Sequence, residues 1–176
     1  MLPRPVACSG VTTRRAAIGS AVFFLVAPAV VAGLVPWLLT DWNAGSASAW
    51  WLPLRIVGSL LVLGGVAVLV HAFARFVVEG RGTPAPVAPP DRLVVGGLYR
   101  YVRNPMYVAV VAAIVGQALL LWRPVLLVYA ALVWVVVALF VRLYEEPELR
   151  RRFGDQYEVY CRAVPAWRPR RTPWQP

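Results

Sequence analysis

The sequence predicts an all-α membrane protein with about four transmembrane helices, and three observations support this fold class. Hydrophobic residues make up 60% of the 176 residues and charged residues only 15%, against about 45–50% and 25% in soluble domains. The apolar residues gather in four runs, each long enough to cross a bilayer as a helix. The arginines gather at the ends of these runs. We therefore expect a single membrane domain over residues 1–176.

The first predicted span covers residues 16–39. It follows Arg14 and Arg15, as the apolar core of a signal peptide would. However, the run is longer than the roughly 7–15 residues of such a core, and no good cleavage site follows it. As a helix it reaches about 36 Å, which is enough to cross the bilayer. We expect a retained helix that Pro28 and Pro36 kink or end.

The second predicted span covers residues 54–78. The loop before it contains Trp42 and Trp50 but no arginine, which is typical of an aromatic belt on the outer side. His71, near the far end of the span, has two interpretations: an interfacial side chain or a buried group that handles protons. Residues 80–90 are rich in proline and predict an extended linker.

The third and fourth predicted spans cover residues 106–122 and 125–141. Each reaches about 25 Å as a helix, near the short end of the spanning range. Because only Arg123 and Pro124 separate them, the sequence predicts a tight antiparallel hairpin. The open ends of the hairpin, residues 99–107 and 142–146, must then lie close together at one membrane face.

The distribution of charge predicts which face this is. The net charge is +10, all 18 basic residues are arginines, and only Arg55 and Arg123 fall on the opposite side of the predicted spans. Arginine-rich segments stay in the cytoplasm, so we expect both termini and the open end of the hairpin to be cytoplasmic. Residues 148–160 predict an amphipathic helix at this interface. Nucleic-acid binding is the alternative use of such a charge, but the arginines do not form a soluble basic module.

Asn104-Pro105 predicts the start of a membrane helix, because Asn favours the N-cap and Pro the first helical position. Such a start either binds an anionic group, such as a carboxylate, or only begins the helix. Two glutamates, Glu145 and Glu146, stand at the expected end of a membrane helix. Their negative charge is unfavourable there, because the helix dipole is negative at this end and the hydrocarbon is close. Either Glu146 pairs with Arg142, four residues before it, or one of the two glutamates accepts hydrogen bonds from a ribose or offsets a positive charge.

Cysteine usage gives no sign of a metal site or a nucleophile. Cys8 and Cys161 fall in segments expected in the cytoplasm, where thiols stay reduced. The sequence has no CxxC motif and no cluster of Cys and His residues, so we expect no metal.

Taken together, three segments resemble a known family. They are GLYRYVRNPMY, the apolar hairpin, and EEPELRRRFGDQYEVYCRAVP. This order resembles the isoprenylcysteine carboxyl methyltransferase and phospholipid methyltransferase superfamily, over about residues 91–169. These are membrane enzymes that use S-adenosylmethionine. The resemblance implies a cofactor pocket at Leu93, Val94, Tyr99, Asn104, Pro105, Met106, Tyr107 and Glu145.

Three positions depart from the pattern of that superfamily. Asn104 replaces the common histidine, so it can donate a hydrogen bond but cannot titrate. Ala109 stands where glycine is frequent. Prenylcysteine enzymes resemble a pattern with a substrate-contacting arginine four residues before the cofactor glutamate; here that residue is Val141, and Arg142 follows.

The resulting hypothesis is methyl transfer from S-adenosylmethionine to a lipophilic or small acceptor, which is a carboxylate, an amine or a thiol. The methyl group is already activated, so the protein needs positioning and electrostatics and no covalent nucleophile. Arg142 and Glu146 are the candidates for acting on the acceptor. A non-catalytic assembly protein with the same fold is the second interpretation. A transporter is the third, with only Gln117, Tyr129 and Trp134 as interior polar candidates.

Overall fold

The computed structural model describes residues 26–45, 51–80 and 93–175, and these residues form helices and loops with no β-strand. The all-α prediction is therefore confirmed for the described part of the chain. The predicted N-terminal start of the first span and the predicted linker after the second lie outside the described residues.

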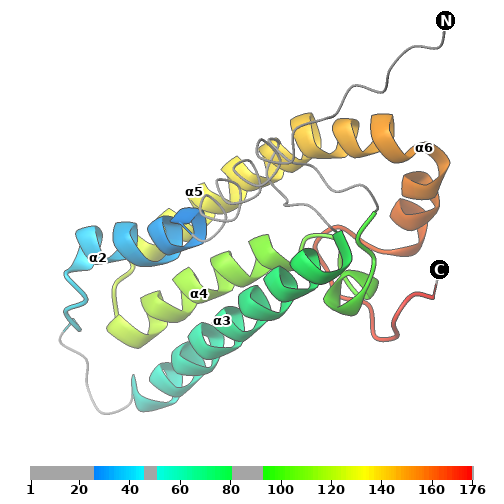
Figure 1. The fold of residues 1–176 in the computed structure, drawn as a ribbon. Helices are drawn as coiled ribbons and strands as arrows, with labels where there is room; N and C mark the ends of the chain where they lie inside the picture. Colours follow the sequence, from blue (N-terminus) through cyan, green and yellow to red (C-terminus); the bar gives the residue numbers. More distant parts are fainter. Residues whose placement is uncertain (1–25, 46–50, 81–92, 176) are drawn as a thin grey trace, which may run out of the picture.

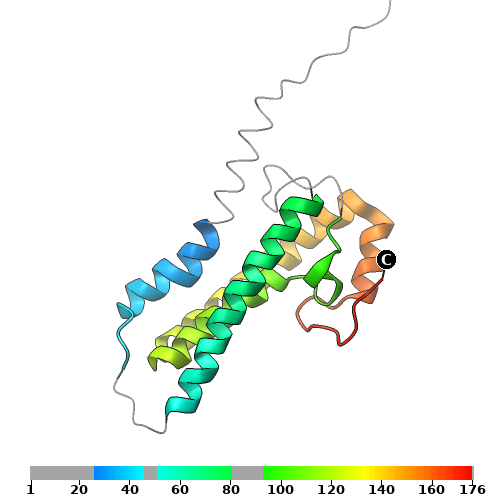
Figure 2. The same cartoon turned by 60° about the horizontal axis from the view of Figure 1, so that its bottom comes forward.

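Four apolar helical segments run side by side along one axis (Figures 1 and 2). The first described helix, Val26–Thr40, contains a π-helical turn and ends in α2, Val35–Thr40. The others are α3, Leu52–Gly80, α4, Pro105–Leu121, and α5, Val125–Phe140. Helix α4 lies between α3 and α5 and contacts both.

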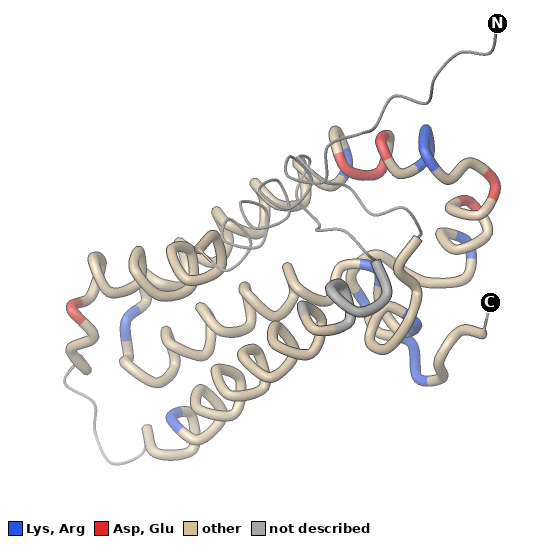
Figure 3. The backbone as a smooth tube through the Cα atoms, viewed as in Figure 1, with Lys and Arg blue, Asp and Glu red and all other residues tan. Residues whose placement is uncertain are grey.

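Charged residues lie toward the two ends of this bundle, and the long middle of each helix carries almost none (Figure 3). Many large apolar side chains on its outer surface are exposed, including Leu63 at 68% and Val128 at 71%. Such a surface suits a bilayer. Leu52–Ala72 and the apolar part of Val125–Ala163 are long enough to cross, whereas Val26–Thr40 and Pro105–Leu121 are shorter. The number of crossings stays a prediction.

The hairpin between α4 and α5 agrees with the sequence prediction to within one residue at each helix boundary. Trp122 ends α4 in the left-handed conformation, with φ 52° and ψ 51°. The Arg123 N–H donates to the carbonyl of Ala118, and Pro124 begins α5. The chain therefore reverses within three residues.

Helices α3 and α4 pack backbone against backbone. A Cβ atom on Gly58 would lie 2.6 Å from the carbonyl oxygen of Gly116, and one on Gly65 would lie 2.8 Å from that of Ala109. Small residues permit such approach between membrane helices. Ala109, which replaces a frequent glycine, is accommodated because Gly65 faces it from α3.

Two interior polar side chains hold the first helix against the hairpin. Gln117 donates to the carbonyl of Ala32 at 2.7 Å, and Tyr129 donates to that of Val31 at 3.0 Å. Both carbonyls belong to the π-helical turn Val30–Leu34. Gln117 and Tyr129, which were two of the three candidates for a transport path, thus hold helices together. The third candidate, Trp134, packs against Trp167.

Helix α5 ends within one residue of the predicted bound, but the chain stays helical beyond it. After α5 the chain continues through a π-helical turn, Val141–Glu145, into α6, Glu146–Ala163. The combined helix of 39 residues would reach about 58 Å if straight, far beyond a hydrocarbon core of about 30 Å. Its apolar part ends with α5, and the polar part lies beyond it.

Helix α6 turns back over the end of the bundle instead of running away from it (Figure 1). Gly154, with φ 48° and ψ −126°, makes the bend. This backbone conformation is open to glycine and strained for other residues. After α6, the tail pairs with the loop before α4: the N–H groups of Arg103 and Arg170 donate to the carbonyls of Pro165 and Tyr101.

Replacing Gly116 by Ala tests the close contact of α3 and α4. Its Cβ would lie 2.7 Å from the Gly58 carbonyl oxygen, so we expect a loss of about 1–3 kcal/mol from overpacking. Gly64→Ala is the matched control, because a Cβ there has no neighbour within 4 Å. The thermal midpoint in detergent should fall for Gly116→Ala and hold for Gly64→Ala. Equal midpoints for the two variants would contradict the packing described.

Candidate functional site

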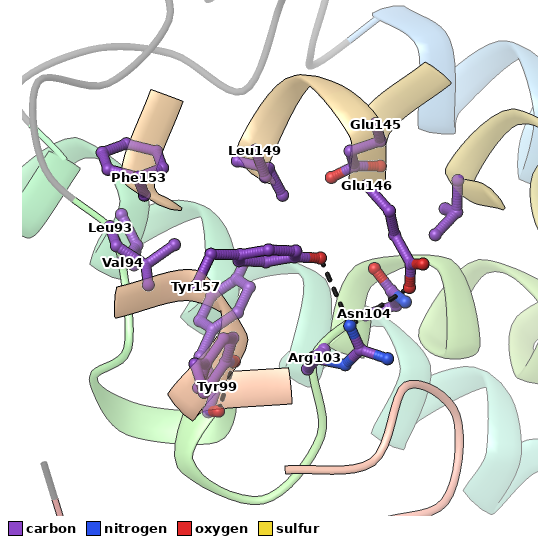
Figure 4. A pocket seen from close by; sticks show the side chains of 12 residues that line it. Leu93, Val94, Tyr99, Arg103, Asn104, Glu145, Glu146, Leu149, Phe153 and Tyr157 are labelled. Atoms are coloured by element: carbon purple, nitrogen blue, oxygen red, sulfur yellow. Dashed lines mark hydrogen bonds and ion pairs between the residues drawn. The ribbon is translucent and has the colours of Figure 1, made fainter. Parts of the chain in front are cut away.

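A cavity of about 70 Å³ lies where the loop before α4 meets the start of α6 (Figure 4). Apolar and aromatic side chains form most of its wall, and four polar or charged side chains reach it at one side. The lining residues are Leu93, Val94, Tyr99, Arg103, Asn104, Val141, Glu145, Glu146, Leu149, Phe153, Tyr157 and Tyr160.

The antiparallel hairpin brings Glu145 to Tyr107. The phenol of Tyr107, on the first turn of α4, donates to Oε2 of Glu145 at 3.1 Å, although the two residues are 38 positions apart. Burial raises the pKa of Glu145, and the hydrogen bond from Tyr107 partly opposes this shift. A carboxylate with a shifted pKa beside a cavity is a feature of functional sites.

Glu146 forms the second contact between the two ends of the hairpin. Its Oε1 lies 3.1 Å from Nη1 of Arg103, and both side chains are about 15% exposed, at 16% and 14%. The same nitrogen of Arg103 donates to the Tyr157 hydroxyl at 3.2 Å and to Sγ of Cys161 at 2.7 Å. Arg103 therefore ties the loop before α4 to two turns of α6 (Figure 4).

Aromatic side chains of α6 close the cavity from the side opposite Glu145. Tyr157 and Tyr160 are each 3% exposed. The Tyr160 hydroxyl donates to the carbonyl of Tyr99 at 2.7 Å. Burial, with a smaller contribution from the charge of Glu145, raises the pKa of the Tyr99 phenol, so this group is neutral at physiological pH.

Asn104 precedes α4 as predicted, but its side chain does not cap the helix. Its side-chain nitrogen donates to the carbonyl of Ala166 at 3.3 Å, and its backbone N–H donates to the same oxygen at 3.2 Å. The amide is thus used to anchor the C-terminal tail. The N-cap position was thus predicted correctly, whereas the contact with the tail joins residues that are distant in sequence and was not predicted.

The structure places six of the predicted site residues on the wall of one cavity: Leu93, Val94, Tyr99, Asn104, Glu145 and Glu146. Tyr107 lies behind Glu145. Met106 packs with Ala72 beneath the wall, and Pro105 faces the opposite side of α4.

Arg142 is exposed and does not line the cavity. The predicted pair between Arg142 and Glu146 is also wrong for the described residues, where Glu146 contacts Arg103 and, at 3.9 Å, Arg150. Because the helix continues into α6, the glutamates do not lie at a helix C-terminus. The unfavourable dipole expected from the sequence therefore does not act on them.

The sequence prediction missed Arg103 and the wall contributed by α6. Arg103 stands beside Asn104 in the motif that carries the resemblance, and Phe153, Tyr157 and Tyr160 stand in its second part. These signals were present, but hydropathy does not show that α6 folds back onto the loop. Among the described residues, no group of three or more His, Cys, Asp or Glu residues could hold a metal ion.

Comparison with known proteins gives two matches. The family model for phospholipid methyltransferase matches residues 54–156, more than half of the chain. A phosphatidylethanolamine N-methyltransferase of Phaeosphaeria nodorum is 32% identical over 66 residues, or 38% of this chain; the match spans 7% of the relative's length. The segment that the family model matches, residues 54–156, contains the hairpin, both glutamates and the loop that carries Arg103. The chain belongs to the phospholipid methyltransferase family.

Proposed function

We propose that this protein transfers a methyl group from S-adenosylmethionine to a lipophilic or small acceptor at the polar end of the helical bundle. The observation that carries the proposal is the shared cavity between the start of α4 and the start of α6. There a partly buried carboxylate, Glu145, is held by Tyr107 from the other arm of the hairpin.

The side chains at this cavity fit the chemistry of the cofactor. S-adenosylmethionine carries a positive sulfonium and a positive amino group, and a buried glutamate offsets such charge. Apolar and aromatic walls, such as Val94, Phe153 and Tyr157, suit an adenine ring. When bound, the cofactor supplies an activated methyl group. The chain orients the two reactants and excludes water. Methyl transfer of this kind needs no covalent nucleophile from the protein.

The volume of the cavity adds a condition. About 70 Å³ is well below the roughly 300–1,000 Å³ of ligand pockets. Binding therefore requires the wall to open. Helix α6 provides much of this wall, and it bends at Gly154. We infer that α6 moves away from the loop to admit the cofactor and returns to close the site.

The acceptor is inferred from the wall and from the relative. Val141 is 3% exposed and lines the cavity, at the position where the prenylcysteine pattern has an arginine. An apolar side chain there does not favour an anionic prenylcysteine carboxylate. The name of the relative specifies a phosphatidylethanolamine nitrogen, so a lipid amine is the first acceptor to test. Acceptors with a carboxylate or a thiol are the next to test.

From the arginine distribution we infer that the cavity lies on the cytoplasmic side, where the soluble cofactor is available. The acceptor then reaches the site laterally from the bilayer. The alternative is a non-catalytic membrane protein that keeps the family fold. Cofactor binding distinguishes the two hypotheses, because a protein used only for assembly has no reason to retain it.

The first test measures binding of S-adenosylmethionine to the purified full chain in detergent by calorimetry. We expect Glu145→Gln to weaken binding about 10–100-fold, because the amide cannot offset positive charge, and Tyr107→Phe about 2–10-fold. Asp155→Asn makes the same change at an exposed position of α6 and should bind as the unmodified chain does.

Transfer of label from methyl-labelled S-adenosylmethionine into phosphatidylethanolamine, or into a total lipid extract, then tests the reaction. No binding at millimolar cofactor would refute the enzyme hypothesis. Binding that Glu145→Gln leaves unchanged would refute the role given to Glu145 alone.

The second test concerns Arg103, which holds α6 against the loop. In Arg103→Gln the ion pair with Glu146 is lost, so α6 should open more often. We expect amide hydrogen exchange in residues 155–163 to be roughly 10–100-fold faster, which corresponds to about 1.5–3 kcal/mol. Arg151→Gln removes an exposed pair with Glu148 and should leave this exchange unchanged. Equal exchange in the two variants would show that Arg103 does not hold α6.

A further inference from the structure

A second and larger hollow, of about 590 Å³, lies between α3 and α4 on the outer side of this helix pair. Its wall is almost entirely apolar. Small residues form its floor: Gly64 and Gly65 on α3, and Ala109 and Ala112 on α4. A Cβ atom built on Gly64 would have no neighbour within 4 Å, so a larger side chain there would extend into the hollow.

The groove is separate from the candidate methyl-transfer cavity, with which it shares no lining residue. On α4 it is lined by Pro105, Val108 and Ala112. At about 100° per residue, this side of α4 faces well away from Tyr107, which contacts Glu145. The groove therefore opens toward the surroundings of the bundle and not toward the hairpin partner α5.

One end of the groove lies at the polar end of the bundle. Tyr101, from the loop before α4, and Pro169, from the C-terminal tail, complete its lining there. Arg168 and Arg170 flank Pro169, and Arg171 follows; Arg168 and Arg171 are exposed. Figure 3 shows basic residues and no acidic ones along this tail.

These arginines form a basic rim that no carboxylate neutralises within the described part of the chain. Residues 93–104 and 164–175 contain no Asp or Glu. None of the ion pairs among the described residues involves Arg168, Arg170 or Arg171. An apolar groove that ends in uncompensated positive charge complements a molecule with a long hydrocarbon chain and an anionic head.

We propose that the groove binds one anionic phospholipid, with an acyl chain along Gly64 and Ala112 and the phosphate at Arg168 and Arg171. Basic residues next to an apolar membrane surface attract anionic headgroups. A second copy of this chain fits less well. Two copies in one bilayer share the same orientation, so a groove-to-groove contact would bring the two basic rims to the same level, where they repel each other.

Native mass spectrometry of the full chain, released from detergent containing phosphatidylglycerol or phosphatidylcholine with identical acyl chains, tests this proposal. Phosphatidylglycerol has no amine, so its retention does not report on an amine acceptor. We expect one retained phosphatidylglycerol per chain, preferred roughly tenfold over phosphatidylcholine. The double variant Arg168→Gln with Arg171→Gln should abolish the preference. Arg55→Gln, which removes an exposed arginine at the other end of α3, should retain it.

Gly64→Leu tests the groove itself, because its Cβ would meet no neighbour within 4 Å and the rest of its side chain would occupy the hollow. It should lose most of the retained lipid. Gly33→Leu is the matched control, since Gly33 also has open space but lies on the first helix. Equal retention in the two glycine variants, or equal retention of the two lipids by the unmodified chain, would overturn the proposal. So would a dimer that Gly64→Leu converts to monomer with lipid retention unchanged.

Discussion

Between Leu121 and Val125 the chain reverses direction within three residues, and the hydrogen bond from Tyr107 to Glu145 depends on this reversal. Helices of nearly equal length, joined so tightly, must bring their free ends to the same level. A longer connection would allow α5 to slide along α4. The partly buried carboxylate of Glu145 would then lose its donor, and a charge removed from water without a partner is costly.

The position of the hairpin against α3 is set by close backbone contact. Gly58 and Gly116 each lie where a Cβ atom would come within 3 Å of the other residue's carbonyl oxygen. In a bilayer the hydrophobic effect does not drive helices together, so van der Waals contact of this kind must do so. Gly65 and Ala109 make a second close contact of this kind and also line the groove beside Gly64.

The sequence predicted the parts of the fold that local pattern determines. The apolar runs and the Arg-Pro junction are local signals, and the bounds of α4 and α5 follow from them almost residue by residue. The pairing of Tyr107 with Glu145 followed from topology, since a hairpin joins its own ends. The fold of the polar end could not be predicted in this way. It depends on the backbone of Gly154, and no hydropathy pattern shows that α6 turns back there. For the same reason the ion pair considered for Glu146 was with Arg142, four residues away in sequence, and not with Arg103.

The two walls of the candidate cavity differ in how firmly they are held. Glu145 and Tyr107 lie at the ends of the packed hairpin, whereas Phe153, Tyr157 and Tyr160 lie on a helix beyond the bilayer part, held by Arg103 and by contacts with the loop. A cavity too small for its proposed ligand must open at the wall that costs least to move, which is α6. On this hypothesis Glu145, in the rigid wall, holds the positively charged part of the cofactor in place. Helix α6, the movable wall, excludes water once it closes. Changes in the rigid wall then act mainly on affinity, whereas changes in α6 act mainly on the rate of transfer from the closed state.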